Sequence, residues 1–473
     1  MSAIQTFSGS YLTNIRTWIV FAFILRLYGI WFPPLEVSHN WRQTTVTMVA
    51  RNFYETDNNI LYPRIDIAGE KSGITGMEFP VLNYLIYLVS LVFGYTHWYG
   101  RLINLIVSSI GVLFFHKLVN RYFGPRLALH SGIVLLFSLW FAYSRKIMPD
   151  TFSMSLVLAG FYYGCLYLEE QKNKLLHLLA YVMLCTTGIL AKLPSAYLLV
   201  LFIPFLFDKN IHLSSKIAIC ACTMVVIAVT GMYYFYWVPY LTETFGFQHF
   251  FMGKSMAIGG YELLTHFGET LARFYDSALK FVGFAFFMFG LVWAFRLKNK
   301  RLLLVFFLCF AAFLPIVLKA GFTFYHHAYY IIPLVPAMAL VCGYGLGFIN
   351  NRKWLAVVLI AIGLEATLNN LDDFYIKPEN KAILNLEHDL DQFSRRSDLI
   401  TTNSGAFPTT MYFSHRKGWV AFNEELSQAH FVDSLKQKGL KYVVVFKRTF
   451  GTDIQIPYKA VLDNQNYRVY KVE

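Results

Sequence analysis

The chain has 473 residues, of which 56% are hydrophobic and 18% aromatic, while only 15% are charged. A soluble protein carries about 25% charged residues, so this composition excludes an ordinary soluble fold and predicts a polytopic, all-α membrane protein. The net charge of +13 would suit a nucleic-acid partner in a soluble protein. Here many lysines and arginines lie in short segments between apolar runs, where they set membrane orientation instead, so membrane lipids and no nucleic acid are expected as partners.

Eleven apolar segments are candidate spans. In chain order they are 15–33, 101–119, 127–143, 151–168, 176–191, 195–208, 217–236, 279–296, 302–318, 329–349 and 354–369. A further apolar run, 79–95, decides the topology, because an added span reverses the side of every later loop. If 79–95 lies in the outer interface, the basic loops share one side with the N-terminus, which the positive-inside rule makes the cytoplasm. We therefore predict about 11 transmembrane helices, with 79–95 and a helix within 250–280 as outer interfacial helices.

This topology divides the chain into a membrane part and a polar tail. Residues 1–371 are expected to form the transmembrane domain, with long outer-face loops at 34–100 and 237–278. Residues 372–473 are expected to form a small extracytoplasmic α/β domain, because strand-like and helix-like segments alternate there. The strand-like segments are 398–404, 411–419, 441–447 and 467–472, and a helix-like segment occupies 423–439.

The first outer loop contains an unusually polar stretch, "SHNWRQTTVTMVARNFYE" at 38–55. Apolar residues at helical spacing predict an amphipathic helix over 41–54, with Asn40 as its cap. A role as a membrane tether explains the apolar residues that lie along one side of this helix. It does not explain why His39, Trp41, Arg42 and Gln43 gather at the start of the helix, so these side chains are candidate substrate-binding residues.

Other polar residues gather at the outer ends of spans. The candidate catalytic carboxylates are Glu36, Asp66, Glu78 and Asp150, and the further candidate binding residues are Arg51, Arg145, Lys146, Lys192, Lys319, His326 and His327. A carboxylate can take a proton from a hydroxyl nucleophile, and cations can neutralise a phosphate leaving group. Carboxylates beside cations at one membrane surface are therefore typical of transfer from a phosphate-linked donor.

Structural roles compete with these functional ones. Asp150 precedes a span and could cap it, and Lys192 ends a span where a cation favours the helix dipole. Glu78 lies in a loop between Gly76 and Pro80 and needs no structural role there. The outer-loop carboxylates could hold a divalent cation, but their spacing specifies no metal site, and no cofactor is predicted with certainty.

The order of these motifs resembles bacterial members of glycosyltransferase family 39. This family belongs to the GT-C class, with the protein O-mannosyltransferases and the lipid A aminoarabinose transferase. The matching motifs are "HNWRQ…ARNFYE", "EFP…YL", "RLINLI", "SRKIMPD", "AKLP" and "HHAYY", and they cover most of residues 10–370.

The resemblance implies a glycosyltransferase of the bacterial inner membrane, with its active face and tail in the periplasm. Such an enzyme moves a sugar from a polyprenyl-phosphate-linked donor to a hydroxyl of a glycan, lipid or protein acceptor, with inversion. Arg145, Lys192 and His326 would lie near the donor phosphate, and the lipid tail would lie in a groove between spans. A carboxylate of an outer loop would deprotonate the acceptor.

The sequence departs from the pattern of the family at one position. The resemblance implies an acidic residue where Thr45 stands. The base is then expected to be Glu78 first and Asp150 second. Two alternatives stay open: a catalytically inactive glycan- or lipid-binding partner of a glycan assembly complex, and a transporter or flippase of polyprenyl-linked glycans. Polar residues at span ends rather than at the membrane midplane favour the transferase over the transporter.

Overall fold

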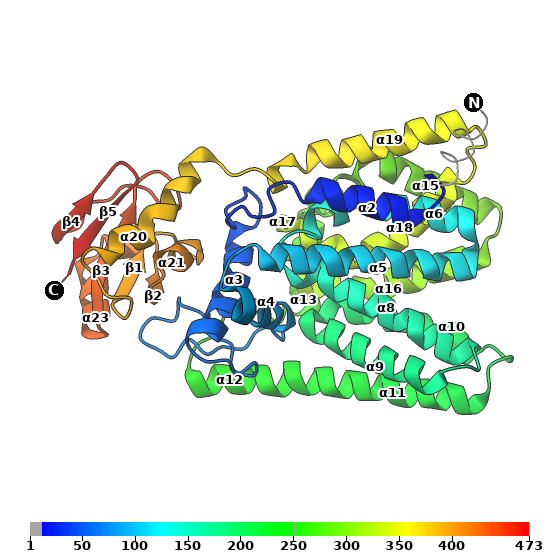
Figure 1. Cartoon of the computed structure of the whole chain (residues 1–473), viewed down its shortest axis with the longest axis horizontal. Helices are drawn as coiled ribbons and strands as arrows, with labels where there is room; N and C mark the ends of the chain where they lie inside the picture. The colour runs from blue at the N-terminus through cyan, green and yellow to red at the C-terminus, as the bar shows by residue number, and fades with distance from the viewer. Residues whose placement is uncertain (1–11, 250, 473) are drawn as a thin grey trace. The chain divides into compact units, whose positions relative to one another are not determined.

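The computed structural model describes residues 12–249 and 251–472, which form two compact units (Figure 1). Unit 1 comprises Met1–Ile30, Arg101–Tyr233 and Phe251–Leu371. Unit 2 comprises Trp31–Gly100, Tyr234–Phe250 and Asp372–Glu473. The first outer loop thus belongs to the same compact unit as the C-terminal tail.

Unit 1 is built from helices, and Figure 1 shows its long helices running alongside one another. Its first half contains α2 (Ile15–Arg26), α5 (Tyr99–Phe123), α6 (Pro125–Leu136), α7 (Trp140–Tyr143), α8 (Pro149–Glu169), α9 (Lys174–Ala191), η1 (Leu193–Phe202), α10 (Ile203–Leu206) and α11 (Leu213–Met232). Its second half contains α13 (Met256–Thr265), α14 (Phe267–Ala272), η3 (Arg273–Ala278), α15 (Lys280–Arg296), α16 (Lys300–Ala320), α17 (Phe322–His326), η4 (Ala328–Leu334), α18 (Val335–Leu346) and α19 (Arg352–Asn369).

Six helices of the described residues are long and apolar enough to cross a membrane, which makes the chain a multi-pass membrane protein. They are Tyr99–Phe123, Pro149–Glu169, Lys174–Ala191, Leu213–Phe245, Lys300–Ala320 and Ala328–Leu346. Two bent helix pairs raise the number to eight if each is one span. The predicted number of eleven is not confirmed, because segments such as 15–33 and 127–143 contain helices of only 12 residues, α2 and α6.

Close approach of backbones holds part of unit 1 together. A Cβ atom added to Gly290 of α15 would lie 2.2 Å from the carbonyl oxygen of Val341 in α18. One added to Gly345 of α18 would lie 2.4 Å from the carbonyl oxygen of Phe286. Small residues at facing positions let membrane helices approach closely, so van der Waals packing is a main source of stability at this contact.

Unit 2 contains a five-stranded sheet in the order β2-β1-β3-β5-β4. The strands are β1 (Leu399–Thr402), β2 (Gly418–Val420), β3 (Leu440–Phe446), β4 (Lys459–Asp463) and β5 (Tyr467–Lys471). Strand β1 pairs in parallel with β2 and β3, whereas β5 pairs antiparallel with β3 and β4. The α/β character predicted for the tail is therefore present as a small mixed sheet.

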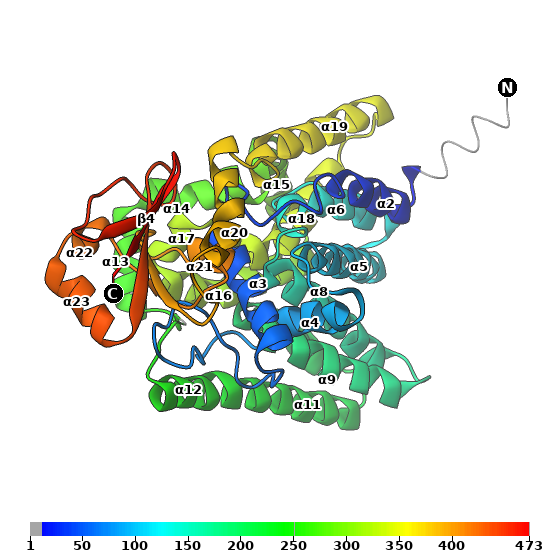
Figure 2. The ribbon, with the colours of Figure 1, turned by 60° about the vertical axis from the view of Figure 1, so that its left-hand side comes forward.

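Helices cover both faces of this sheet (Figure 2). The helices of the tail are η5 (Leu371–Asp373), η6 (Pro378–Asn385), α20 (Leu386–Asp391), α21 (Thr409–Ser414), α22 (Asn423–Leu426) and α23 (Ala429–Gln437). Leu426 and Val432 of α22 and α23 pack against Val443 and Val445 of β3. On the other face, α20 and α21 share a core with the alternate residues of β3, and Met48 and Phe53 of the first outer loop join that core.

The outer-loop segments of unit 2 are also helical. They are α3 (Asn40–Glu55), α4 (Val81–Phe93), η2 (Tyr233–Trp237) and α12 (Val238–Phe245). The helix predicted over 41–54 is present as α3, but the expectation of an exposed polar face is wrong. Every residue of α3 from Gln43 to Arg51 is buried, because the polar side chains also face protein: the Thr44 hydroxyl lies 3.3 Å from that of Thr409.

Two interpretations of the tail require correction. The segment 411–419 is not a strand, because its first part belongs to helix α21 and only Gly418–Val420 pairs in the sheet. The helix expected over 423–439 is broken into α22 and α23. Strand β4 was not predicted. It lies at the edge of the sheet, and its residues are partly or fully exposed. An exposed edge strand needs no alternation of apolar and polar residues, so its strand signal in the sequence is weak.

Candidate functional site

The start of α3 places several candidate residues of unit 2 next to one another. His39 precedes the helix with a left-handed backbone (φ 61°), which turns the chain into α3. The Gln43 amide donates to the Glu36 carboxylate at 3.0 Å, and both side chains are buried. A buried carboxylate requires such a donor, so this bond ties the segment before α3 to the first turn of the helix.

Arg42 and Glu78 form an ion pair in unit 2. The two side chains are only 12% and 9% exposed, so the pair is largely shielded from water. His249 lies close enough to feel both charges: burial and then Arg42 lower its pKa to about 4, while Glu78 opposes this shift. His249 is thus neutral near pH 7 and can accept a proton or a hydrogen bond beside the Arg42–Glu78 pair. It was not predicted, because no periodic pattern marks its segment.

Further along α3, Arg51 holds the loop and the tail of unit 2 together. Its guanidinium contacts the Asp66 carboxylate at 3.1 Å and donates to the Tyr412 carbonyl oxygen at 2.9 Å. It also lies over the Tyr412 ring, 4.6 Å from the ring centroid. Asn52 donates to the same Asp66 carboxylate at 2.8 Å. The contacts of Arg51 and Asp66 are those of a structural crosslink.

Thr45 occupies the position where the resemblance implies an acid. Its hydroxyl donates to the backbone carbonyl of Trp41 at 2.9 Å, one helical turn earlier, and the residue is buried. A threonine in this arrangement has its proton committed to the helix backbone. It offers no group with which to accept a proton from an acceptor hydroxyl.

In unit 1, Arg145 and Lys146 lie in a short segment between α7 and α8 and are almost completely buried. Arg145 donates to the carbonyl oxygen of Gly29 at 2.9 Å. Arg26, the charge within the first apolar run, is also buried and contacts Ser144.

Asn104 of α5 fixes the backbone of that basic segment. Its amide group lies 3.0 Å from the Tyr143 carbonyl oxygen, 2.7 Å from that of Lys146 and 3.2 Å from that of Met148. The Asn104 amide thus serves carbonyl groups of a buried segment, which need a hydrogen-bond donor. Asn104 lies within the "RLINLI" motif, but its role as a clamp is visible only in three dimensions.

Asp150 and Lys192 form a second ion pair of unit 1. The Asp150 carboxylate lies in the first turn of α8, 3.7 Å from the Lys192 ammonium group that follows α9. The hydroxyl of Ser153 donates to the carbonyl oxygens of Gly188 and Lys192, at 2.7 and 3.2 Å, and so joins the two helix ends. A narrow crevice beside the pair is lined by Asp150, Lys192, Ser195, Tyr329 and Pro333, among others.

Two tyrosines of unit 1 connect the candidate residues. Lys192 lies 5.6 Å from the centroid of the Tyr329 ring, and His327 stacks on the same ring at 5.4 Å. Tyr143 lies 6.4 Å from Tyr329, and Lys146 lies 5.5 Å from the Tyr143 ring. Asp150, Lys192, His327 and Lys146 are thus brought around Tyr143 and Tyr329. Tyr329 lies in the "HHAYY" motif, and Tyr143 directly precedes the "SRKIMPD" motif.

Lys319 and His326 are candidate residues that do not join the group around Tyr143 and Tyr329. Lys319 lies in the last turn of α16 and donates to the Lys254 carbonyl oxygen at 3.5 Å. His326 is exposed and stacks on Phe322, with the ring centroids 3.8 Å apart. Neither has a contact with Tyr143 or Tyr329 among the described residues, so His326 and His327, though adjacent in sequence, face different surroundings.

The described residues contain no group of three or more His, Cys, Asp or Glu side chains that could hold a metal ion. The carboxylates of the candidate site are instead engaged by cations: Glu78 by Arg42, Asp66 by Arg51 and Asp150 by Lys192.

Comparison with known proteins identifies related folds. The family described as dolichyl-phosphate-mannose-protein mannosyltransferase matches residues 78–235. No curated protein sequence matches the chain. The crystal structure of ArnT from Cupriavidus metallidurans bound to undecaprenyl phosphate is similar with a TM-score of 0.58 and 13% identity, over 96% of this chain and 98% of that one.

Two other solved structures have a similar fold. The oligosaccharyltransferase of Archaeoglobus fulgidus gives a TM-score of 0.52 and 12% identity, over 90% of this chain and 67% of that one. The arabinofuranosyltransferase AftD from Mycobacteria gives 0.57 and 12%, over 97% of this chain and 40% of that one. These matches confirm the resemblance that was inferred from the motifs, at the level of the fold.

Proposed function

We propose, from the GT-C glycosyltransferase fold of this chain, that it is a membrane enzyme that transfers a sugar from a polyprenyl-phosphate-linked donor. The acceptor is a hydroxyl group of a glycan, lipid or protein on the extracytoplasmic face, and the anomeric carbon is inverted. The enzyme resides in the bacterial inner membrane, with its active face and tail in the periplasm. The observation that carries the proposal is the similarity, over nearly the whole chain, to ArnT, whose structure contains undecaprenyl phosphate.

The donor phosphate is assigned to the basic residues of unit 1. Arg145 and Lys146 are held in a buried segment by the Asn104 clamp, and Lys192 lies beside Asp150 and the Tyr329 ring. Preorganised cations in a shielded site stabilise the charge that develops on a phosphate leaving group. His327, stacked on Tyr329, is a further donor for this group. His326 is assigned a weaker part, since it stacks on Phe322 instead.

The general base is assigned to Glu78. An arginine partner favours the ionised form of a carboxylate, which is the form that accepts a proton, and Glu78 is bound by Arg42. In the proposed step Glu78 takes the hydroxyl proton, the acceptor oxygen attacks the anomeric carbon, and the bond to the donor phosphate breaks. Asp150 is the second candidate base. The contacts of Glu36 with Gln43 and of Asp66 with Arg51 favour structural roles for these two carboxylates.

The remaining residues of the first outer loop are assigned to positioning. Arg42 orients Glu78, Gln43 and Glu36 fix the first turn of α3, and His39 and Trp41 lie next to them in the chain. Lys319 is assigned an outer part in substrate binding, whereas Arg51 is assigned to the structural crosslink with Asp66 and Tyr412. We infer that this loop binds and positions the substrate rather than supplying the base, because α3 has no acid before Glu55.

One observation favours a second function, that of a catalytically inactive glycan- or lipid-binding partner. The hydroxyl of Thr45 is bonded to the helix backbone at the position where the resemblance implies an acid. An inactive relative would retain the cations that bind the donor and would lack turnover.

A panel of polyprenyl-phosphate-linked sugars distinguishes the two functions. The purified protein in detergent is incubated with each donor, and both binding and release of polyprenyl phosphate are measured. The enzyme is expected to bind and turn over at least one donor, with slow hydrolysis when no acceptor is added. Binding without any release, with every donor and with acceptor extracts present, would support the inactive partner instead.

A further inference from the structure

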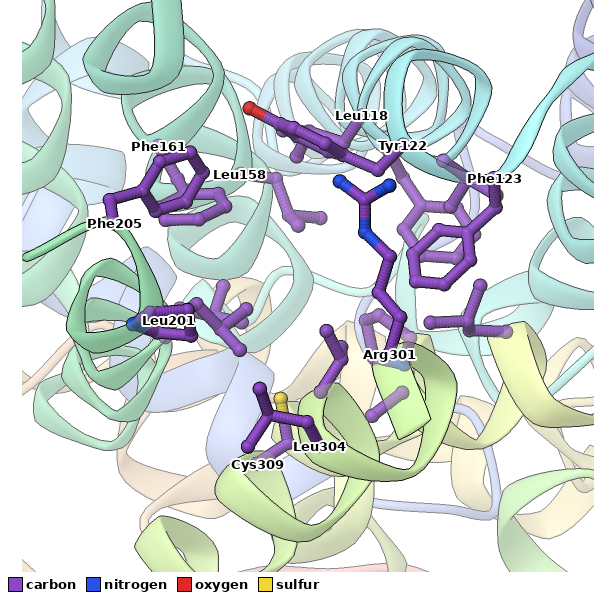
Figure 3. A pocket seen from close by; sticks show the side chains of 18 of the residues that line it. Leu118, Tyr122, Phe123, Leu158, Phe161, Leu201, Phe205, Arg301, Leu304 and Cys309 are labelled. Atoms are coloured by element: carbon purple, nitrogen blue, oxygen red, sulfur yellow. The ribbon is translucent and has the colours of Figure 1, made fainter. Parts of the chain in front are cut away.

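A cavity of about 240 Å³ lies in unit 1 (Figure 3). Its walls come from the last turns of α5, from the middle and the end of α8, from η1 and α10, from the first half of α16 and from the first half of α18. Asp150 lies in the first turn of α8, whereas Glu169, which lines the cavity at its surface end, is the last residue of that helix. At 1.5 Å per residue these two residues are about 29 Å apart along the helix axis, while Leu158 on the inner wall is about 12 Å from Asp150. The mouth of the cavity is therefore distant from the site around Asp150.

The cavity leads from the surface into the interior of the helix bundle. Leu304, on its wall, is 48% exposed, whereas Cys309 and Leu340, also on its wall, are 2% and 4% exposed. Most of the lining is aliphatic or aromatic. An apolar cavity of about 150 Å³ in a soluble protein already excludes water and binds benzene. A larger apolar cavity with an exposed wall, in a membrane-spanning bundle, suits a hydrocarbon chain.

Arg301 stands at the rim of this cavity. Figure 3 shows its side chain rising from α16 with the guanidinium close to the rings of Tyr122 and Phe123. The guanidinium carbon lies 5.1 and 5.5 Å from the two ring centroids. Within the described part of the chain, Arg301 has no ion pair with a carboxylate.

The two carboxylates on the rim are engaged by other groups. Glu169 is bound by Arg121 at 2.5 Å and by the hydroxyl of Tyr122 at 2.8 Å. Asp208 accepts a hydrogen bond from the backbone N–H of Asn210 at 2.9 Å. Arg301 is therefore a cation whose full charge can act on a ligand at the mouth of the cavity.

The surrounding surface is strongly basic. Thirteen lysines and arginines lie in the helix ends and connections at this end of unit 1, against three carboxylates, Glu169, Glu170 and Asp208. They are Lys117, Arg121, Arg126, Lys172, Lys174, Lys209, Lys216, Arg296, Lys298, Lys300, Arg301, Arg352 and Lys353. Basic pockets between membrane helices are typical sites for the head groups of anionic lipids.

We propose that the cavity binds one acyl chain of an anionic phospholipid, whose headgroup phosphate contacts Arg301. The apolar walls hold the chain, and the cation at the rim selects the anionic head group. The headgroup end of this site, at Arg301 and Glu169, is distant from Asp150 and Lys192, and the proposal does not depend on the protein's being a transferase. The competing occupant is the distal part of a polyprenyl chain.

Binding is measured by native mass spectrometry of the full-length protein in detergent, titrated with phosphatidylglycerol and with phosphatidylcholine of identical acyl chains. The wild-type protein is expected to prefer phosphatidylglycerol. Arg301→Gln is expected to weaken phosphatidylglycerol binding about tenfold and to remove the preference, because a hydrogen bond to a charged group has about this effect on affinity. The matched control is Arg296→Gln, since Arg296 lies over the Trp293 ring in the same connection but does not line the cavity.

A second variant tests the cavity rather than the charge. Leu201→Trp, which places a larger ring in the cavity, is expected to weaken binding of both lipids, whereas Leu199→Trp on the same helix, outside the lining, is not. Equal lipid preference in Arg301→Gln and Arg296→Gln, or equal binding in the two tryptophan variants, would overturn the proposal. Displacement of bound phosphatidylglycerol by stoichiometric polyprenyl phosphate would overturn it in favour of the polyprenyl chain.

Discussion

At the scale of single residues, the charges of the candidate site occur in pairs. Arg42 is paired with Glu78, Arg51 with Asp66, and Lys192 with Asp150. A charge buried without a partner is costly, and removing one partner strands the other. Each substitution in this site therefore changes both stability and chemistry, so a functional test needs a measurement of folding beside it.

Lys192 provides the first prediction. Lys192→Gln is expected to weaken binding of polyprenyl phosphate about tenfold, because a hydrogen-bonded cation that contacts a phosphate has about this effect on affinity. The measurement is a titration of the purified protein with polyprenyl phosphate.

The matched control for this prediction is Lys172→Gln. Lys172 is exposed and precedes α9, whereas Lys192 follows it, so the two lysines flank the same helix at opposite ends. Equal affinity of both variants for polyprenyl phosphate would remove Lys192 from the donor site. Thermal unfolding of both variants shows whether the loss of the Asp150 partner has altered the fold.

The sequence allowed the candidate acids and cations to be chosen by residue type and by position at helix ends. It did not allow their partners to be chosen. Glu78 lies 36 positions from Arg42, and Arg51 lies 361 positions from the Tyr412 carbonyl oxygen that it binds. Such pairs depend on the path of the loops between helices, which hydrophobic periodicity does not specify. His249 and Asn104 were missed for the same reason.

At the scale of elements, α3 is held by contacts at both of its ends. Beyond its last turn, His415 bridges two carboxylates: its Nδ1 lies 2.6 Å from Glu387 and its Nε2 lies 2.7 Å from Glu55 of α3. Arg51 and Arg396 are the other charges that act on this cluster. His415 has a left-handed backbone (φ 48°), which ends α21 and directs the ring toward the two acids.

The stability supplied by this cluster depends on pH. Burial lowers the pKa of His415, but the hydrogen bonds to Glu387 and Glu55 outweigh this and raise the pKa above 6.5. The hydrogen bond from His415 lowers the pKa of Glu387 below 4.5, and the pKa of Glu55 is also lowered, despite its burial. The contribution of His415 is complete below pH 6.5 and is lost as the pH rises through its raised pKa, whereas that of the acids is complete above pH 4.5.

His415→Asn is therefore expected to lower the thermal unfolding temperature most at about pH 5.5 and least at about pH 9. Asparagine is chosen because it tolerates a left-handed backbone better than most residues. The control is His430→Asn, an exposed histidine of α23, for which no such dependence is expected. A difference between wild type and His415→Asn that stays constant across this pH range would contradict the prediction.

The hydrophobic periodicity of the sequence predicted helices better than strands. The 3.6-residue periodicity of 41–54 is present in α3, and the apolar run 79–95 is present as α4. By contrast, the segment 411–419 has β-forming residues but begins with α21, in which every residue from Thr409 to Ser414 is buried. Packing against the shared core of unit 2 thus overrides intrinsic strand propensity there.

At the scale of the whole molecule, each of the eleven apolar segments that were chosen from the sequence overlaps a helix, but only six to eight helices of the described residues meet the length and composition expected of a span. An apolar run is expected in a helix that is buried in protein as well as in a helix that faces lipid. Helix α18, whose residues are nearly all buried, and helix α11, whose apolar side chains are largely exposed, have similarly apolar sequences. Composition alone therefore cannot separate a core helix from a lipid-facing one.

The contact between α15 and α18 provides a prediction at this scale. Gly290→Leu is expected to destabilise the protein by about 1–3 kcal/mol, because the added side chain would force apart two backbones that touch. The measurement is the thermal unfolding temperature in detergent. Gly268→Leu is the control, since a Cβ at Gly268 would have no atom within 4 Å. Equal unfolding temperatures of the two variants would show that the close approach of these helices is not needed.

The central claim is that the chain transfers sugar with Glu78 as the base. The most direct test is the rate of transfer from a polyprenyl-phosphate-linked sugar by purified Glu78→Gln, beside the wild type and Glu70→Gln, an exposed acid of the same loop. Loss of a general base is expected to slow transfer about 10²–10⁴-fold with donor binding unchanged, while Glu70→Gln keeps wild-type turnover. Glu78→Gln also removes the carboxylate of the ion pair with Arg42, so a lower thermal unfolding temperature is expected, and transfer is measured well below that temperature. Wild-type turnover by Glu78→Gln would contradict the assignment of the base.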